Sequence, residues 1–166
     1  MMIRFISSIT ALAVFWLGTG FVTAEADDKP QAQILQVYKS ATCGCCNDWM
    51  AHMRANAFTL NGNDLANLTQ FKLRHGIELR YQSCHTAFTP QGFVFEGHIP
   101  ARFVNQFLAE PPSEAIGLAI PGMPVGSPGM EVGDKFMPYQ VLLLKRDGNH
   151  EIYACLLYTS DAADDL

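Results

Sequence analysis

Three cysteines stand within four consecutive residues, in the segment Cys43-Gly44-Cys45-Cys46. Gly44 has no side chain, so the backbone can turn tightly and let the three sulfur atoms converge on one point. The thiolate form of cysteine is both the nucleophile and the metal ligand, and a helix N-terminus favours that anion. The segment therefore predicts either a soft-metal site or a reactive dithiol.

Two further donor residues, Cys84 and His85, lie directly before a run that indicates a β-hairpin. In a thioredoxin-like fold this segment packs beside the N-terminus of the first helix, so we expect Cys84 to supply a fourth thiol. Soft thiolates favour monovalent copper, zinc or iron–sulfur centres. The candidate metal ligands are Cys43, Cys45, Cys46, Cys84 and, beside them, His85.

Weaker candidate ligands lie outside the cysteine segments. Residues 117–138 are rich in glycine and proline, which predicts a long loop, and this loop carries Met123 and Met130. Thioether sulfur favours monovalent copper, so the two methionines place copper ahead of zinc, although methionine also fills gaps in protein cores. His98, at an expected strand-to-helix turn, is left open between a ligand and a structural residue.

Three other interpretations of the cysteines stay open. Four thiols in an exported protein can form two disulfides, but the neighbours Cys45 and Cys46 are awkward partners, and a domain of this size does not need such crosslinks. In a thiol–disulfide oxidoreductase, Cys43 acts as the nucleophile and Cys46 as the resolving thiol. That enzyme gives Cys45 no role, and Cys84 stands where thioredoxins usually carry a cis-proline. The third interpretation is a zinc-stabilised structural domain.

Both ends of the chain are expected to lie outside the folded domain. Residues 1–24 combine Arg4, an apolar stretch and small residues at the end, which is typical of a secretory signal peptide, and residues 25–33 indicate a flexible leader. The apolar stretch is shorter than the roughly 18 residues of a membrane span. Residues 155–166 resemble the translation of a sequencing adapter, and we predict that they are non-native. The single domain then covers residues 34–154, and export predicts a periplasmic location.

The charge pattern excludes one class of partner. The chain has a formal net charge of −5 at pH 7, and its basic residues form no run. Nucleic-acid-binding proteins carry a basic patch or stripe, so no nucleic-acid partner is expected. Partners are expected among small ligands and proteins, with no membrane contact after cleavage of the signal peptide.

Periodicity and turn residues predict an alternating order of strands and helices. The expected strands cover residues 34–38, 86–88, 93–95, 140–145 and 151–154, and the expected helices run from the cysteines to 57, from 64 to 75 and from 100 to 108. Residues 58–63 show no clear strand. This order, with a Cys-x-x-Cys pair opening the first helix, predicts an α/β fold: a thioredoxin-like sandwich with a long Gly/Pro/Met-rich loop and a C-terminal hairpin.

Four motifs together resemble a known family of periplasmic metal-binding proteins. They are TCGCCNDW at residues 42–49, SCHTA at 83–87, EGHIPA at 96–101 and GLAIPGMPVGSPGME at 117–131. Their order is similar to that in the family that includes the CopG-type copper-resistance proteins, which was once catalogued only as a domain of unknown function. Four separate motifs are far more specific than a lone Cys-x-x-Cys.

The resemblance implies a thioredoxin-like fold, export to the periplasm and a role in copper tolerance. It implies that copper, Cu(I) above all, is held by the cysteines at positions 43, 45, 46 and 84, with zinc as the alternative metal. It also suggests an interconversion of Cu(I) and Cu(II), and partners among other periplasmic copper-handling proteins. It leaves open whether the chain is an enzyme or a binding protein.

Overall fold

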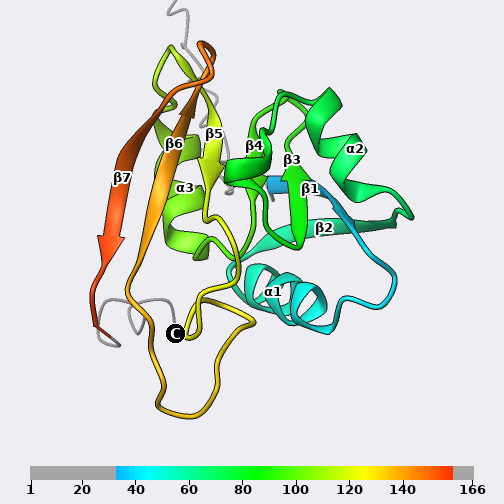
Figure 1. Ribbon diagram of the computed structural model, residues 1–166, viewed down its shortest axis with the longest axis vertical. Helices are drawn as coiled ribbons and strands as arrows, with labels where there is room; N and C mark the ends of the chain where they lie inside the picture. The colour runs from blue at the N-terminus through cyan, green and yellow to red at the C-terminus, as the bar shows by residue number, and fades with distance from the viewer. Residues whose placement is uncertain (1–32, 159–166) are drawn as a thin grey trace, which may run out of the picture. The chain divides into compact units, whose positions relative to one another are not determined.

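Seven strands of the described chain form one mixed sheet, in the order β2-β1-β3-β4-β5-β6-β7 (Figure 1). The computed structural model describes residues 33–158. The strands are β1 (Gln33–Lys39), β2 (Phe58–Asp64), β3 (His85–Phe88), β4 (Val94–Glu96), β5 (Ala115–Ala119), β6 (Tyr139–Lys145) and β7 (His150–Leu156). The helices are α1 (Gly44–Ala55), α2 (Leu68–Arg74), the 3-10 turn η1 (Leu79–Tyr81) and α3 (Ala101–Ala109). The predicted single α/β domain is confirmed, and the thioredoxin-like arrangement within that class stays a prediction.

β1 has a central place because it pairs with β2 in parallel and with β3 in antiparallel direction. The β3–β4 and β6–β7 pairs are both antiparallel, which confirms the two predicted hairpins. The register of β1 and β3 places Lys39, the last residue of β1, opposite His85, the first residue of β3. The chain after β1 and the chain before β3 therefore meet at the same edge of the sheet.

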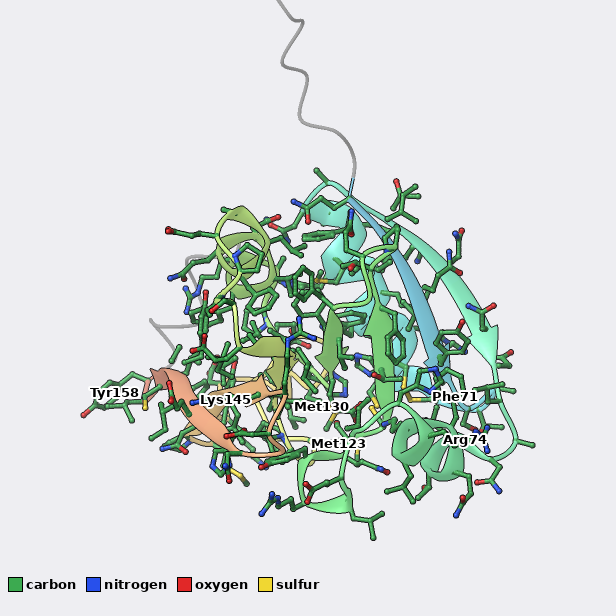
Figure 2. The ribbon with its side chains drawn as sticks, turned by 90° about the horizontal axis from the view of Figure 1, so that it is seen from above. Phe71, Arg74, Met123, Met130, Lys145 and Tyr158 are labelled. Atoms are coloured by element: carbon green, nitrogen blue, oxygen red, sulfur yellow. A yellow bond between two sulfur atoms is a disulfide. The ribbon has the colours of Figure 1, made fainter. Side chains whose placement is uncertain are left out.

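The two faces of the sheet bury different residues, because successive side chains of a strand point to opposite faces. Along β6, Val141 and Leu143 belong to the core that α1 and α3 cover, whereas Leu142 and Leu144 belong to the core on the other face. α2 packs on that second face, where the ring of Phe71 lies 4.4 Å from the ring of Tyr38 between centroids. Figure 2 shows α2, labelled at Phe71 and Arg74, and the β6–β7 hairpin, labelled at Lys145 and Tyr158, on opposite sides of the view.

The structure corrects the sequence analysis at three element boundaries. Residues 58–63, expected to be irregular, belong to β2, whose parallel pairing with β1 forms along an otherwise polar sequence. The second helix begins after Asn67, whose side chain accepts a hydrogen bond from the backbone N–H of Gln70, and Asp64 instead ends β2. The long loop begins after β5 rather than at residue 117. In addition, β7 continues past residue 154 to the fully buried Leu156.

Several predictions fall on parts of the chain that the structure does not describe. The predicted signal peptide at residues 1–24 lies outside the described residues, and so does the predicted leader except for Gln33. Residues 159–166 of the predicted non-native tail also lie outside them. No helix within the described part of the chain is both long and apolar enough to cross a membrane.

Candidate metal centre

The first cysteine segment forms the start of α1. Cys43 is the N-cap residue, and its backbone N–H donates to the carbonyl oxygen of Ser40 at 3.1 Å. Cys45 and Cys46 follow in the first turn of the helix. The predicted tight turn at Gly44 is wrong, because this glycine is an ordinary first helical residue and a Cβ there would meet nothing within 4 Å. The helical turn itself brings the three sulfur atoms together.

Cys84 brings a fourth sulfur atom from the strand edge next to α1. Its Sγ lies 3.4 Å from Sγ of Cys46 and 3.8 Å from Sγ of Cys45. The Sγ atoms of Cys43 and Cys45 are 3.6 Å apart. The ligand atoms of all four cysteines lie within 4.8 Å of one another. We call these four residues the cysteine cluster, and the structure shows the convergence that the sequence predicted.

The cysteine cluster has one crosslink. Cys43 and Cys46 form a disulfide with their Cα atoms 5.3 Å apart, whereas Cys45 and Cys84 are free. A metal binds the thiolate form, so the disulfide withdraws two of the four sulfur atoms from coordination. The predicted four-thiol site therefore corresponds to the reduced state of this cluster.

His98 approaches the same site from the turn after β4. Its Nε2 lies 3.0 Å from Sγ of Cys84, and its Nδ1 lies 2.8 Å from the carbonyl oxygen of Pro128. A carbonyl only accepts hydrogen bonds, so Nδ1 carries the proton and the lone pair of Nε2 faces Cys84 in the neutral ring. Burial lowers the pKa of His98, against the opposite effects of Pro128 and Glu131. From sequence alone His98 is open between a ligand and a structural residue, and its place in the EGHIPA motif is the one signal that favours a ligand.

His85 is fully buried beside Cys84. Its Nδ1 lies 3.4 Å from Sγ of Cys84, and its ring centroid lies 4.9 Å from that of His98. Burial, followed by the charges of His98 and Lys72, lowers the pKa of His85 well below its ordinary value. Its Nε2 is buried without a hydrogen-bond partner among the described residues, which is the kind of polar atom that a ligand satisfies. Cys84, His85 and His98 thus form a second donor group that shares one thiol with the cysteine cluster.

The Cys84 thiol is protonated at neutral pH. Burial raises its pKa from 9.0 to about 12, and the charge and hydrogen bond of Cys45 act in the same direction, whereas Ser83 and Lys72 act against them. A metal that binds Cys84 must displace this proton. Metal binding at this thiol therefore releases a proton and strengthens as the pH rises.

The glycine- and proline-rich loop covers the start of α1. At Gly129, φ is +81°, and a Cβ would lie 2.6 Å from the backbone nitrogen of Trp49 in α1, so only glycine allows this approach. Pro128, one residue earlier, supplies the carbonyl that orients His98. Met130, one residue later, is partly buried. The loop therefore brings its backbone, and Met130 with it, to the region of the cysteine cluster.

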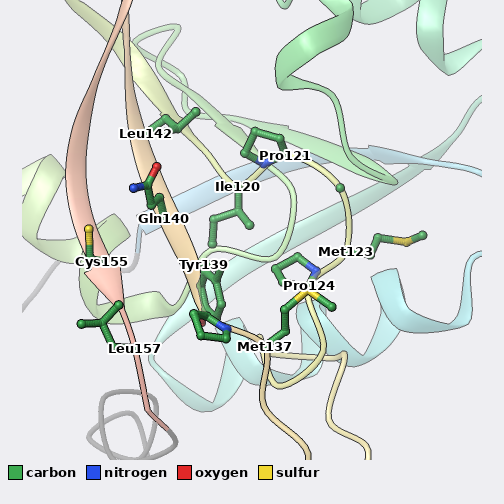
Figure 3. Close-up of a pocket in the computed structure, with 12 residues that line it drawn as sticks. Ile120, Pro121, Met123, Pro124, Met137, Tyr139, Gln140, Leu142, Cys155 and Leu157 are labelled. Carbon is green, nitrogen blue, oxygen red and sulfur yellow. The ribbon is translucent and has the colours of Figure 1, made fainter.

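Met123 lies in a different setting. It is 50 % exposed and lines a groove of about 640 Å³ together with Met137, which is 53 % exposed. Figure 3 shows the two methionines on one side of this groove and Cys155 and Leu157 of the β7 segment on the other. We call this the β6–β7 groove. Metal binding by Met123 and by Met130 stays a prediction.

The chain matches one family profile and is similar to two solved structures of one protein. A family profile described as "Protein of unknown function, DUF411" matches residues 81–130. The chain is similar to a solved structure of "Copper resistance protein copG" in Form 2, with 38 % identity, a TM-score of 0.72, and coverage of 76 % of this chain and 100 % of that one. The Form 1 structure matches with 38 % identity, a TM-score of 0.71, and coverage of 76 % and 98 %. No curated protein matches the sequence.

Proposed function

This chain belongs to the CopG family of copper resistance proteins, and we propose that its cysteine cluster binds copper, Cu(I) above all. The relatives and the clustered cysteines together support a copper-related function. The ligands that we propose are Cys43, Cys45, Cys46 and Cys84, with His85 and His98 beside them and Met123 and Met130 as weaker candidates. Binding is the primary role, and an interconversion of Cu(I) and Cu(II) at the same site is a further hypothesis.

One observation carries the proposal: sulfur atoms from two distant segments meet. Cys46 and Cys84 are 38 residues apart in sequence, and their Sγ atoms are 3.4 Å apart. Soft thiolate donors select Cu(I), zinc and iron–sulfur centres over hard cations such as magnesium and calcium. A neutral histidine nitrogen that faces one of these thiols extends the donor set without adding charge.

A metal titration tests the proposal. The purified chain is reduced, Cu(I) is added without oxygen, and bound copper is counted after weakly held metal has been removed by a chelator. We expect at least one tightly bound ion per chain, and the loss of that ion in Cys84→Ser. Cys155→Ser is the matched control, because Cys155 is exposed on β7 and belongs to neither donor group. Less than one tightly held ion per chain would contradict the proposal.

Zinc is the alternative metal, because it also accepts thiolate and imidazole ligands. A zinc-stabilised domain unfolds when a chelator removes the metal and refolds with zinc alone. The structure buries an extended apolar core on both faces of the sheet. We therefore expect the metal-free reduced chain to keep its fold, and circular dichroism after chelation distinguishes the two roles.

The second candidate function is a thiol–disulfide oxidoreductase, which the Cys43–Cys46 disulfide favours. In this function Cys43 attacks a protein disulfide and Cys46 resolves the mixed disulfide. Neither step needs Cys45 or Cys84. Protein-disulfide reduction that survives in Cys45→Ser and Cys84→Ser would support the enzyme, whereas loss of activity in either variant favours the metal site.

We place the protein in the periplasm, on the strength of the predicted signal peptide at residues 1–24 and of its copper-resistance relatives. Its expected partners are copper ions and other periplasmic copper-handling proteins. Fractionation of cells that express the full chain tests the location. A periplasmic fraction that contains a chain shortened at its N-terminus is the expected result, and a full-length cytoplasmic chain would contradict it.

A further inference from the structure

A buried ion pair contacts the backbone on both sides of Cys84. Lys72 of α2 and Glu96 of β4 have side chains that are 1 % and 0 % exposed, and Lys72 Nζ lies 2.5 Å from Glu96 Oε1. Removing two charges from water is costly, and their attraction compensates only when geometry and further hydrogen bonds are good. The groups that this pair holds in place should therefore explain why it is buried.

The ammonium group of Lys72 has three N–H donors, and the structure provides three acceptors. Besides Glu96, it donates to the carbonyl oxygen of Ser83 at 2.8 Å and to that of His85 at 3.3 Å. Glu96 Oε1 also accepts a hydrogen bond from the backbone N–H of Ser83 at 2.6 Å. The ion pair therefore binds the residue before Cys84 and the residue after it.

The Cys84 side chain lies outside this network and belongs to the metal centre. Its Sγ lies 3.4 Å from Sγ of Cys46 and 3.0 Å from Nε2 of His98. The preceding residues are tied to the long loop, because the hydroxyl of Ser83 donates to the carbonyl oxygen of Gly122. The backbone at Cys84 is thus held by α2, β4 and the loop, and its thiol is directed at the other cysteines.

We infer that Lys72 and Glu96 are positioning residues of the metal centre: they hold the 83–85 backbone so that the Cys84 thiol and the His85 ring face the cysteine cluster. This inference rests on the proposed metal-binding function. Without the pair, Ser83 would lose hydrogen bonds at both its carbonyl oxygen and its N–H, whereas the carbonyl oxygen of His85 would keep the bond from the N–H of Gly97. Residues that orient ligands in this way typically contribute 10- to 100-fold to metal affinity.

A purely structural role for the pair predicts that removing it changes stability and leaves the Cu(I) affinity unchanged, whereas the positioning role predicts a loss of affinity. A double variant separates these two roles. Replacing a buried ion pair by apolar residues of similar size is often neutral or stabilising for the fold. Lys72→Met with Glu96→Leu therefore removes the hydrogen bonds to the 83–85 backbone without leaving a buried unpaired charge. Val104→Ala, in α3, is the control for a general loss of stability, because Val104 is fully buried and belongs to neither donor group.

The experiment measures Cu(I) affinity of the reduced chain by competition with a chromophoric chelator, the ultraviolet charge-transfer absorption of the copper-loaded chain, and thermal unfolding of the metal-free chain. We expect the double variant to unfold at a lower temperature, because Ser83 loses two backbone hydrogen bonds, and to bind Cu(I) about tenfold more weakly or worse, with an altered absorption band. Val104→Ala should unfold at a lower temperature and bind Cu(I) normally. Glu96→Gln, which keeps the size of the side chain, should give a smaller loss of affinity in the same direction.

Wild-type affinity and absorption in the double variant would overturn the positioning role. If the double variant does not fold, Glu96→Gln decides by the same two measurements. Cys84→Ser in the same series separates this inference from the proposed function. Unchanged Cu(I) binding in Cys84→Ser would contradict the proposed function itself, whereas weakened binding in Cys84→Ser with normal binding in the double variant would contradict only the positioning role.

Discussion

The cysteine cluster and the β6–β7 groove are both rich in sulfur, and they differ in how the sulfur atoms are held. In the cluster, four cysteine sulfur atoms lie within 4.8 Å of one another at the start of a helix and on a segment held by hydrogen bonds from Lys72 and Glu96. In the groove, Met123, Met137 and Cys155 belong to exposed parts of the surface. Metal affinity depends on donors that a rigid backbone already brings together. We therefore expect tight metal binding at the cluster, with Met123 of the groove as a weak ligand at most.

The largest expected effect comes from removing the sulfur atom that joins the two cysteine segments. Cys84→Ser should weaken Cu(I) binding more than about 100-fold, because it removes a ligand outright rather than a residue that orients one. Cys155→Ser should leave the affinity unchanged. Both are measured by chelator competition on the reduced chain, and equal effects of the two substitutions would abolish the distinction between cluster and groove.

The oxidation state of Cys43 and Cys46 should have the next largest effect on Cu(I) affinity. The Cys43–Cys46 disulfide withdraws two thiolates, so the oxidised chain should bind Cu(I) at least about tenfold more weakly than the chain reduced with dithiothreitol. Copper titrations before and after reduction measure the difference. In Cys43→Ser, which cannot form this disulfide, the difference should change, because the freed Cys46 thiol has only Cys84 within 3.4 Å as a new disulfide partner. A wild-type chain that binds equally well in both states would show that Cys43 and Cys46 are not ligands.

His98 should have a smaller effect than either change in the cysteines. In His98→Gln the nitrogen that faces Cys84 is lost, and we expect a loss of Cu(I) affinity of about tenfold. His75→Gln is the matched control, because His75 is an exposed residue at the end of α2. Copper competition on both variants gives the comparison. Equal affinities in the two variants would exclude His98 from the centre.

The methionines should show the smallest effects. Met123→Leu and Met137→Leu keep the size of the side chain and remove the thioether from the β6–β7 groove, so the Cu(I) affinity should stay within about threefold of wild type. Met130→Leu should lower the Cu(I) affinity most among the three substitutions, because the loop packs on α1 next to this residue. A tenfold loss in Met123→Leu would make Met123 a strong ligand. It would contradict the expectation that tight binding belongs to the cysteine cluster.

Much of the cysteine cluster could be predicted because three of its four residues are neighbours in the sequence. Three cysteines in one helical turn converge by helix geometry, and Cys84 stands before the predicted hairpin, in a segment that the sequence places beside the start of the first helix. His98 could not be assigned in the same way. Its orientation depends on the Pro128 carbonyl, 30 residues further along an irregular loop, and no local pattern encodes that contact.

The wrong element boundaries also have physical reasons. β2 has a polar sequence because it is an edge strand with an exposed side, and its pairing with β1 decides its structure. β5 resembles a loop because of Gly117, yet a Cβ at this position would overlap the backbone of Val94 in β4, so the close approach of two strands requires glycine. At the start of α2, Asp64 and Asn67 are both good caps, and tertiary pairing selects the second.

The sulfur content of the first coordination shell of bound copper tests the central claim most directly. X-ray absorption at the copper edge, on the reduced chain loaded with one equivalent of Cu(I), should show a shell made mainly of sulfur in the wild type and fewer sulfur atoms in Cys84→Ser. A shell that is unchanged in Cys84→Ser, or that consists of nitrogen and oxygen in the wild type, would contradict the account.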